Sequence, residues 1–193
     1  MKLTLDWNCV IEAENNQPQA HSLQRLVESH RSGSVDVALL GASASENTRE
    51  KRLPSTFHHF QMKIEDLGWS DLPIVPMPCV IGLTYIGRSF IVGDADLFKR
   101  DVNAIWEVIA PNVPRAPRDI ASNWEESKDI GSEDLARWRN VWCDVMSAYS
   151  HIKADRDVFV TNNTRDFQSK STPLSKLGMK RICTPDEAVN LVR

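Results

Sequence analysis

The sequence predicts an α/β fold, a three-layer α/β/α sandwich with a central, mainly parallel sheet. Apolar runs rich in Val, Ile and Leu alternate along the chain with segments whose apolar residues recur at helical spacing. Strands of a parallel sheet are buried on both faces, so they appear in a sequence as continuous apolar runs. The 193 residues, of which 41% are hydrophobic and 25% charged, fit one domain over 1–193.

Strands and helices alternate in the prediction. Strands are expected at 2–5, 35–40, 157–161 and 181–183, and helices at 19–31, 55–67, 96–109 and 133–152. The last of these helices is the best defined, because its apolar residues recur at steps of three and four and form one stripe. They are Leu135, Trp138, Trp142, Val145, Tyr149 and Ile152.

Capping signals mark where several helices begin or end. Gly33 ends the helix at 19–31. A polar helix is expected after Gly41, with Ser43 or Ser45 as its N-cap. The run Thr184-Pro185-Asp186-Glu187 combines a capping box with Pro at the first helical position, which predicts a short C-terminal helix.

The segment at about 68–95 differs in composition from the rest of the chain and is predicted to be an insert. Pro73, Pro76 and Pro78 exclude a helix there. The stretch from Cys79 to Val92 is rich in Val, Ile, Tyr and Phe, which favours a hairpin.

Charge and cysteine content exclude several classes of protein. With 23 Lys and Arg against 26 Asp and Glu, the net charge of −3 excludes a basic protein that coats nucleic acid. No apolar run approaches the ~20 residues of a membrane helix, and the opening Met-Lys-Leu-Thr-Leu-Asp is not a secretory signal. The four cysteines form no Cys-x-x-Cys pair. A cytoplasmic protein without membrane contact is therefore expected.

Acidic residues follow the predicted strands where a parallel sheet would gather them. The carboxyl ends of parallel strands share one edge, and sites form there. The first strand is followed by Asp6 and Asn8, and the second leads to Glu46 on the next helix, with Glu50 one turn further on. The long helix contributes Asp144 at the margin of its apolar stripe.

The strand at 157–161 brings further polar groups to the same edge. It ends in Thr161, and Asn163 and Asp166 follow. Asp6, Glu46 and Asp144 would repel one another there unless a cation were bound. Mg²⁺ or Mn²⁺ takes such oxygen ligands and can promote attack of water on a phosphodiester. A metal site that promotes attack of water on a nucleic-acid phosphodiester is therefore predicted, although the chain has a net negative charge.

Three stretches resemble PIN domains, a family of metal-dependent ribonucleases that includes toxins. Residues 5–12 (LDWNCVIE) look like the family's opening, in which an Asp closes the first strand and an Asn follows two residues later. Residues 144–151 (DVMSAYSH) resemble its central Asp-bearing helix, and residues 157–167 (DVFVTNNTRDF) its last core strand and loop. The resemblance covers about 1–67 and 96–193.

The resemblance implies an endoribonuclease that uses Mg²⁺ or Mn²⁺ and leaves a 5′-phosphate and a 3′-hydroxyl. It assigns catalysis and metal binding to Asp6, Glu46 and Asp144, with Asn8 and Thr161 orienting the carboxylates. Many family members carry a fourth acid where this chain has Asn163, and Asp166 comes later. RNA is the implied substrate, and an antitoxin or other protein partner and a homodimer stay open.

Two other functions stay open beside the nuclease. A catalytically degenerate PIN-like module would bind RNA or a protein partner without cutting, and the Asn at 163 favours it. A phosphatase of the haloacid dehalogenase type is suggested by Asp6 together with residues 93–96 (GDAD), but its Asp-x-Asp motif would need an acid where Asn8 stands. The neighbouring His58 and His59 cannot face one metal together, because adjacent helical positions diverge.

Overall fold

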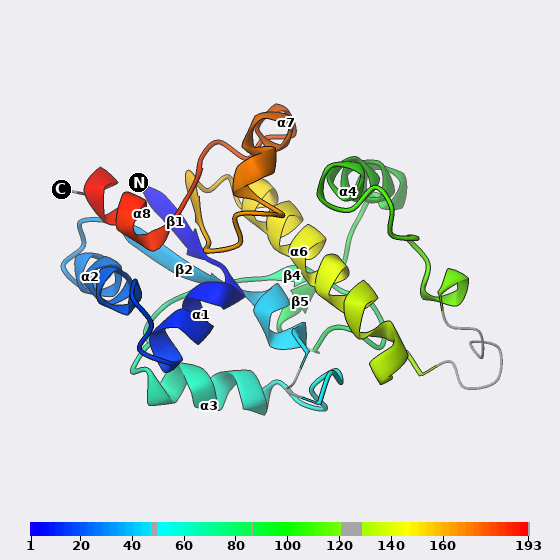
Figure 1. Cartoon of the computed structure of the whole chain (residues 1–193), viewed down its shortest axis with the longest axis horizontal. Helices are drawn as coiled ribbons and strands as arrows, with labels where there is room; N and C mark the ends of the chain where they lie inside the picture. Colours follow the sequence, from blue (N-terminus) through cyan, green and yellow to red (C-terminus); the bar gives the residue numbers. More distant parts are fainter. Residues whose placement is uncertain (48–49, 86, 121–128, 193) are drawn as a thin grey trace.

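A five-stranded parallel sheet forms the centre of the computed structural model, which describes residues 1–47, 50–85, 87–120 and 129–192 (Figure 1). The strand order is β3-β2-β1-β6-β7, so the first strand lies in the middle. In register, Leu3 of β1 lies opposite Val37 of β2 and Val158 of β6. The strands are β1 (Lys2–Leu5), β2 (Asp36–Leu40), β3 (Ile74–Val75), β6 (Val158–Val160) and β7 (Ile182–Cys183).

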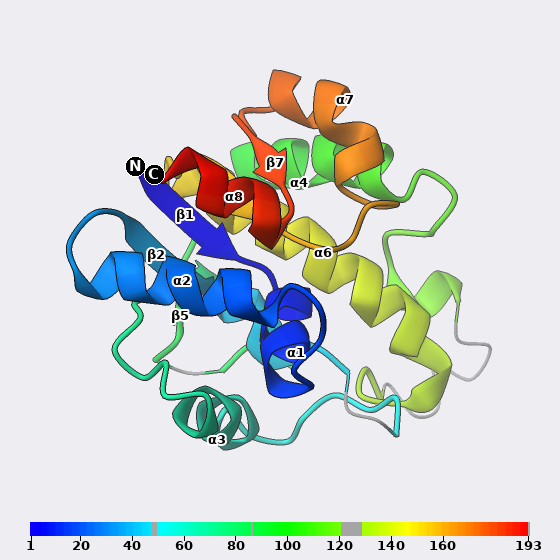
Figure 2. The same ribbon diagram turned by 60° about the vertical axis from the view of Figure 1, so that its left-hand side comes forward.

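Helices pack on both faces of this sheet. One face is covered by α1 (Trp7–Glu14), α2 (Ala20–Arg31), α3 (His58–Asp66) and α8 (Pro185–Leu191). The other is covered by α4 (Ala95–Ile109), α6 (Ala136–Lys153) and α7 (Ser171–Lys176). Figure 2 shows α2 and α8 in front of β1 and β2, with α4 and α6 behind. The predicted α/β class with a central parallel sheet is confirmed.

The two faces of β1 illustrate why both layers are needed. Leu3 and Leu5 are fully buried against the side of α1 and α2. Thr4, between them, faces α6, where its hydroxyl lies 2.6 Å from His151 Nδ1. A strand with apolar or hydrogen-bonded side chains on both faces is stable only between two layers.

The predicted strands and most predicted helices are confirmed. The helix expected at 133–152 begins with a 3-10 turn, η3 (Glu133–Leu135), before α6. The C-terminal capping box is also present: Thr184 Oγ1 accepts from the Glu187 amide at 3.3 Å, and Glu187 Oε2 accepts from the Thr184 amide at 2.8 Å. Two more 3-10 turns are η2 (Pro117–Asp119) and η4 (Gln168–Lys170).

The polar helix expected after Gly41 is wrong. The described part of this segment forms a 3-10 turn, η1 (Gly41–Ser45), and Glu46 follows in extended conformation with φ −65° and ψ 147°, whereas residues 48 and 49 of the expected helix lie outside the described residues. Contacts distant in sequence hold this turn. Ser45 Oγ donates to the Leu83 carbonyl at 2.6 Å, and the Tyr85 hydroxyl donates to the Ala44 carbonyl at 3.1 Å.

The hairpin expected within 68–95 is also wrong. β3 from this segment joins the central sheet beside β2. β4 (Met77–Pro78) and β5 (Ser89–Phe90) form a separate two-stranded sheet, but they run parallel. The chain between them loops back, with Leu83 buried in the core shared by α4 and α6. None of the described helices is both long and apolar enough to cross a membrane.

Candidate active site

The centre of the candidate site is Asp6, which follows β1 and precedes α1. Its carboxylate is 1% exposed, and its Oδ2 accepts from Thr161 Oγ1 at 2.8 Å and from Asn8 Nδ2 at 3.1 Å. Thr161 follows β6, the neighbour of β1 in the sheet. The predicted orienting roles of Asn8 and Thr161 therefore match contacts to one carboxylate oxygen.

A chain of hydrogen bonds continues from Thr161 along the following loop. Thr161 Oγ1 accepts from the Asn163 amide at 3.0 Å, and Asn163 Oδ1 accepts from the Asp166 amide at 3.0 Å. The Asp166 carboxylate pairs with Arg165 at 3.1 Å and lies 3.6 Å from Lys170 Nζ. Asn163 thus shapes the loop, and Asp166 is balanced by two cations.

Glu46 and Asp144 line a cleft of about 720 Å³, together with Trp7 and Asn8, which follow Asp6 in the chain. Both side chains are half-buried. Glu46 enters from the end of η1, and Asp144 from the middle of α6. Asn8, Asn163 and Asp166 line the same cleft, whereas Glu50 does not. The structure therefore brings the predicted site residues of four separate chain segments to one place.

Burial raises the pKa of all three acids, and the charge of Asp6 adds to the effect on the other two. Burial raises the pKa of Asp6 despite the hydrogen bonds from Thr161 and Asn8. Burial, then the charges of Asp144 and Asp6, raise the pKa of Glu46 well above its usual range. Burial, then Asp6 and Asp166, do the same for Asp144. Carboxyls with raised pKa values are difficult to ionise at the same time, and a bound cation would stabilise their ionised forms.

Asp166 behaves in the opposite way. Burial alone would raise the pKa of its carboxyl, but hydrogen bonds from Arg165 and Asn163, together with the charges of Arg165 and Lys170, hold it below the usual value. Asp166 is therefore already compensated by protein cations. It contributes less to the need for a cation than Asp6, Glu46 and Asp144 do.

Basic side chains surround the acidic centre. Lys51, Arg137 and Arg165 line the cleft together with Trp7. Lys51 pairs with Glu133 at 3.2 Å, and Arg165 with Asp166, whereas the exposed Arg137 makes no ion pair within the described residues. An acidic floor with cations at the rim suits a substrate whose phosphates approach from the rim.

Arg139 is the main residue supporting the cleft that was not singled out from the sequence. It is fully buried on α6, among the apolar residues of the helix, and burial lowers its pKa. Its guanidinium donates to Asn47 Oδ1 at 2.8 Å and to three carbonyls, of Ile130, Ser132 and Lys51, at 2.6 to 2.7 Å. It fastens the segment beside Glu46 to α6.

Asn47 is a second cleft residue that the sequence did not single out. Its Nδ2 donates to the Ala136 carbonyl at 2.7 Å and to Asn140 Oδ1. A basic residue within an otherwise apolar helix stripe was the only available signal, and it pointed to Arg139 alone. Asn47 had no such signal, because its role depends on partners about ninety positions away.

The donor set decides which cation would fit. In the described ranges, no three His, Cys, Asp or Glu side chains converge closely enough to ligate one ion together. All available donors at the cleft floor are carboxylate and amide oxygens, which hard divalent cations prefer. Mg²⁺ typically keeps several waters and uses only one or two carboxylates. The residues therefore fit a hydrated ion rather than a fully protein-ligated one.

The 93–96 motif and the pair of neighbouring histidines lie outside the acidic cleft. Asp94 caps α4 by accepting from the Leu97 amide at 2.9 Å and lines a different pocket from Glu46 and Asp144. The phosphatase hypothesis thus lacks its second motif at the cleft. His58 and His59 are exposed on α3 and do not line the cleft either.

Comparison with known proteins does not identify the chain: no family model, no curated protein and no solved structure matches it.

Proposed function

We propose that the chain is a metal-dependent endoribonuclease of PIN-domain type that hydrolyses RNA at the acidic cleft. One observation carries the proposal. Glu46 and Asp144 line one cleft, and the buried Asp6, whose charge acts on both of them, is held beside it by the Thr161 hydroxyl from the neighbouring strand end. The resemblance of 5–12, 144–151 and 157–167 to PIN domains supports the same assignment.

Asp6, Glu46 and Asp144 would hold a Mg²⁺ or Mn²⁺ ion, in part through its waters. When bound, the ion would lower the pKa of a water and stabilise charge developing on the phosphate. Thr161 and Asn8 each donate to Asp6 Oδ2 and so keep the carboxylate in a fixed orientation. This preorganisation leaves less side-chain freedom to lose when the ion binds.

The cleft rim favours a single-stranded nucleic acid. Lys51, Arg137 and Arg165 can contact phosphates, and Trp7 offers an aromatic face for an unstacked base. The bases of a duplex are stacked and unavailable to such a side chain. The proposed products are a 5′-phosphate and a 3′-hydroxyl.

The experiment is cleavage of an end-labelled single-stranded RNA with Mg²⁺ or Mn²⁺. Wild type is compared with Asp144→Asn, with an EDTA control, and with Asp66→Asn, which neutralises an exposed acid on α3 away from the cleft. We expect cleavage by wild type and Asp66→Asn only. Cleavage that survives Asp144→Asn, or products ending in a 2′,3′-cyclic phosphate, would contradict the proposal.

A binding module without catalysis is the second candidate. It is favoured by Asn163, which stands where many PIN domains have an acid, and by the absence of three converging metal ligands among the described residues. RNA binding that persists with EDTA and with Asp144→Asn, without cleavage under any condition, would select this alternative.

A further inference from the structure

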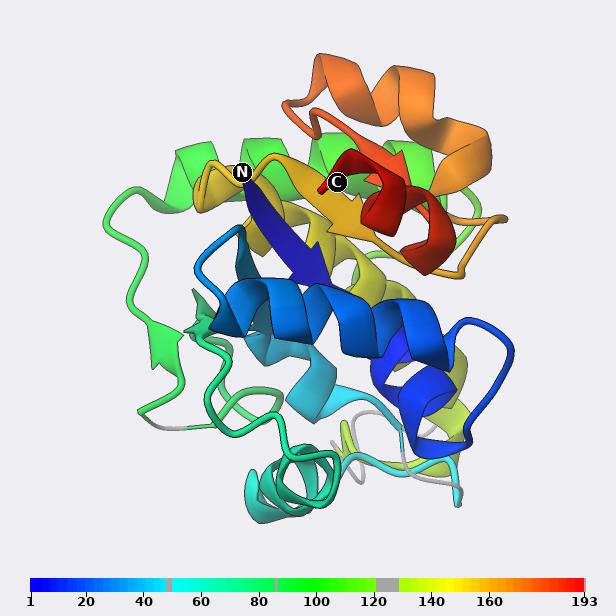
Figure 3. The ribbon, with the colours of Figure 1, turned by 90° about the vertical axis from the view of Figure 1, so that its left-hand side faces the viewer.

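The two-stranded sheet leaves one strand edge open. β5 pairs with β4 and with no other strand of the described part of the chain. Figure 3 shows β5, green at the left, at the outer edge of the molecule with no strand beyond it. An open strand edge is a template on which another strand can add.

The backbone of this edge is oriented for pairing. Ser89 and Phe90 lie opposite Met77 and Pro78, and the Phe90 carbonyl accepts from the Cys79 amide at 2.8 Å. Phe90 therefore turns its backbone groups toward β4. Since consecutive residues of a strand direct these groups to opposite sides, Ser89 and Ile91 direct theirs outward. Ile91 has no backbone hydrogen bond to another described residue.

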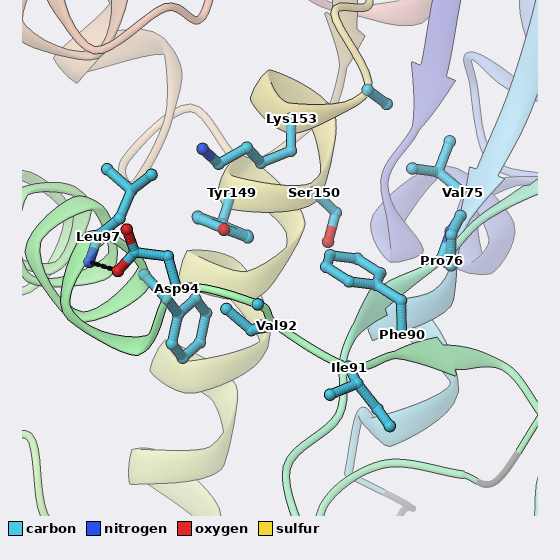
Figure 4. A pocket seen from close by; sticks show the side chains of 13 residues that line it. Val75, Pro76, Phe90, Ile91, Val92, Asp94, Leu97, Tyr149, Ser150 and Lys153 are labelled. Atoms are coloured by element: carbon cyan, nitrogen blue, oxygen red, sulfur yellow. Dashed lines mark hydrogen bonds between the residues drawn. The ribbon is translucent and has the colours of Figure 1, made fainter.

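The side chains of the edge are apolar and exposed. Ile91 is 90% exposed. Phe90, Ile91 and Val92 line an apolar pocket of about 390 Å³ between the edge, α4 and α6. Figure 4 shows the Phe90 ring directed toward Ser150, whereas the Ile91 side chain extends in a different direction. A strand added here would cover apolar surface on both sides of the backbone.

We propose that residues 88–94 form a homodimer interface, in which this segment pairs antiparallel with the same segment of a second copy about a two-fold axis at Ile91. In that register Ile91 faces the partner subunit's Ile91 as a hydrogen-bonded pair, and Ser89 faces the partner subunit's Gly93. These are the residues whose backbone groups point outward. Phe90 then faces the partner subunit's Val92 as a non-hydrogen-bonded pair, whose side chains lie close together.

Charge complementarity selects a second copy as the occupant. Residues 89–93 carry no charge, and the segment begins with Arg88 and ends with Asp94, both exposed. Antiparallel self-pairing places each Arg88 opposite the partner subunit's Asp94, so two opposite-charge pairs frame the apolar centre. A register shifted by two residues would lose both pairs. An isologous contact of this kind closes at two copies.

The pairing is compatible with the present contacts of these two charges. Arg88 stacks on Phe57 at 4.8 Å, which leaves its nitrogens free to bond in the plane of the guanidinium. Asp94 uses Oδ1 to cap α4, which leaves Oδ2. None of 88–94 lines the acidic cleft, so the dimer goes beyond the proposed nuclease and does not depend on it.

A disulfide experiment tests the register. The Cα atoms of an antiparallel hydrogen-bonded pair lie about 5.5 Å apart, within disulfide reach. In a Cys79→Ser background, which removes the exposed native thiol, Ile91→Cys is expected to form a covalent dimer on mild oxidation. Ile81→Cys, at a side chain 96% exposed outside the segment, is the control and should stay monomeric. Equal cross-linking of the two variants, or none, would overturn the register.

Sedimentation of the full chain tests the interface itself. Wild type should show twice the 21.8 kDa of one chain. Ile91→Lys and Arg88→Asp should each give monomers with unchanged circular dichroism, and Ile81→Lys should stay dimeric. Adding Asp94→Arg to Arg88→Asp should restore the dimer. A wild type that is monomeric at every concentration, or a dimer insensitive to Ile91→Lys and Arg88→Asp, would overturn the proposal.

Discussion

The buried guanidinium of Arg139 gives the sharpest prediction about how the cleft is built. Replacing Arg139 with Met keeps a long apolar stem on α6 and removes every donor. Four acceptors lose their partner: Asn47 Oδ1 and the carbonyls of Ile130, Ser132 and Lys51. Asn47 and Lys51 on one side, and Ile130 and Ser132 on the other, would then lack their shared anchor beside the cleft.

The size of the effect follows from these four bonds. A hydrogen bond to a charged group contributes about 1.5 kcal/mol or more net, and an acceptor left buried without a partner costs a similar amount. Removing the guanidinium also relieves its desolvation, which offsets part of the loss. We expect Arg139→Met to lower the free energy of unfolding by about 3–5 kcal/mol.

Urea unfolding followed by circular dichroism measures this change. The matched control is Arg137→Met, which removes an exposed Arg two positions earlier on the same helix and should change stability by about 0.5 kcal/mol or less. Arg139→Lys should fall between wild type and Arg139→Met, because an ammonium cannot reach all four acceptors. A loss below about 1 kcal/mol for Arg139→Met, or one no greater than that of Arg137→Met, would refute the role of Arg139 as an anchor.

Three further predictions follow from buried polar groups. Asp144→Asn should raise the melting temperature in EDTA, and more at pH 8 than at pH 5. The reason is that a carboxyl whose pKa is raised in the folded state lowers stability as the pH rises. Differential scanning calorimetry measures the change, and equal increases at the two pH values would contradict the prediction. Burial, then the charges of Arg156 and Lys180, lower the pKa of His151 to about 3. Since only the unfolded state takes up that proton, the free energy of unfolding should fall by about 2 kcal/mol from pH 7.5 to pH 5. Urea unfolding of His151→Asn should not show this fall. Thr161→Val should cost about 1–3 kcal/mol in urea unfolding and weaken Mn²⁺ binding, because Asp6 loses a buried donor; unchanged Mn²⁺ affinity would count against its orienting role.

Features of the fold that depend on nearby residues were predictable. The apolar runs of β1 and β2, the stripe of α6 and the capping box at Thr184 are local patterns with one dominant solution. The helix expected after Gly41 failed because the Leu83 carbonyl and the Tyr85 hydroxyl bond the turn at 41–45 instead. The hairpin failed because composition predicts extended chain but not which direction two strands run.

The candidate site shows the same division. Asp6 and Thr161 were predictable, because strand order alone brings the ends of β1 and β6 side by side. Glu46 was predicted to be at the site, but on a helix that does not form. Arg139 had one local signal, but neither its partners nor Asn47 could be placed, because the bonds from Arg139 to Asn47 and Lys51 join segments about ninety residues apart.

The most direct test of the central claim is Mn²⁺ binding to the RNA-free protein, measured by electron paramagnetic resonance. Cleavage depends on presenting a suitable RNA, whereas ion binding depends on the acidic cleft alone. We predict saturable binding by wild type and by Asp66→Asn, displacement by Mg²⁺, and loss of binding in Asp6→Asn and Asp144→Asn variants that remain folded. Binding that is unchanged in both cleft variants, or absent from folded wild type, would contradict the account.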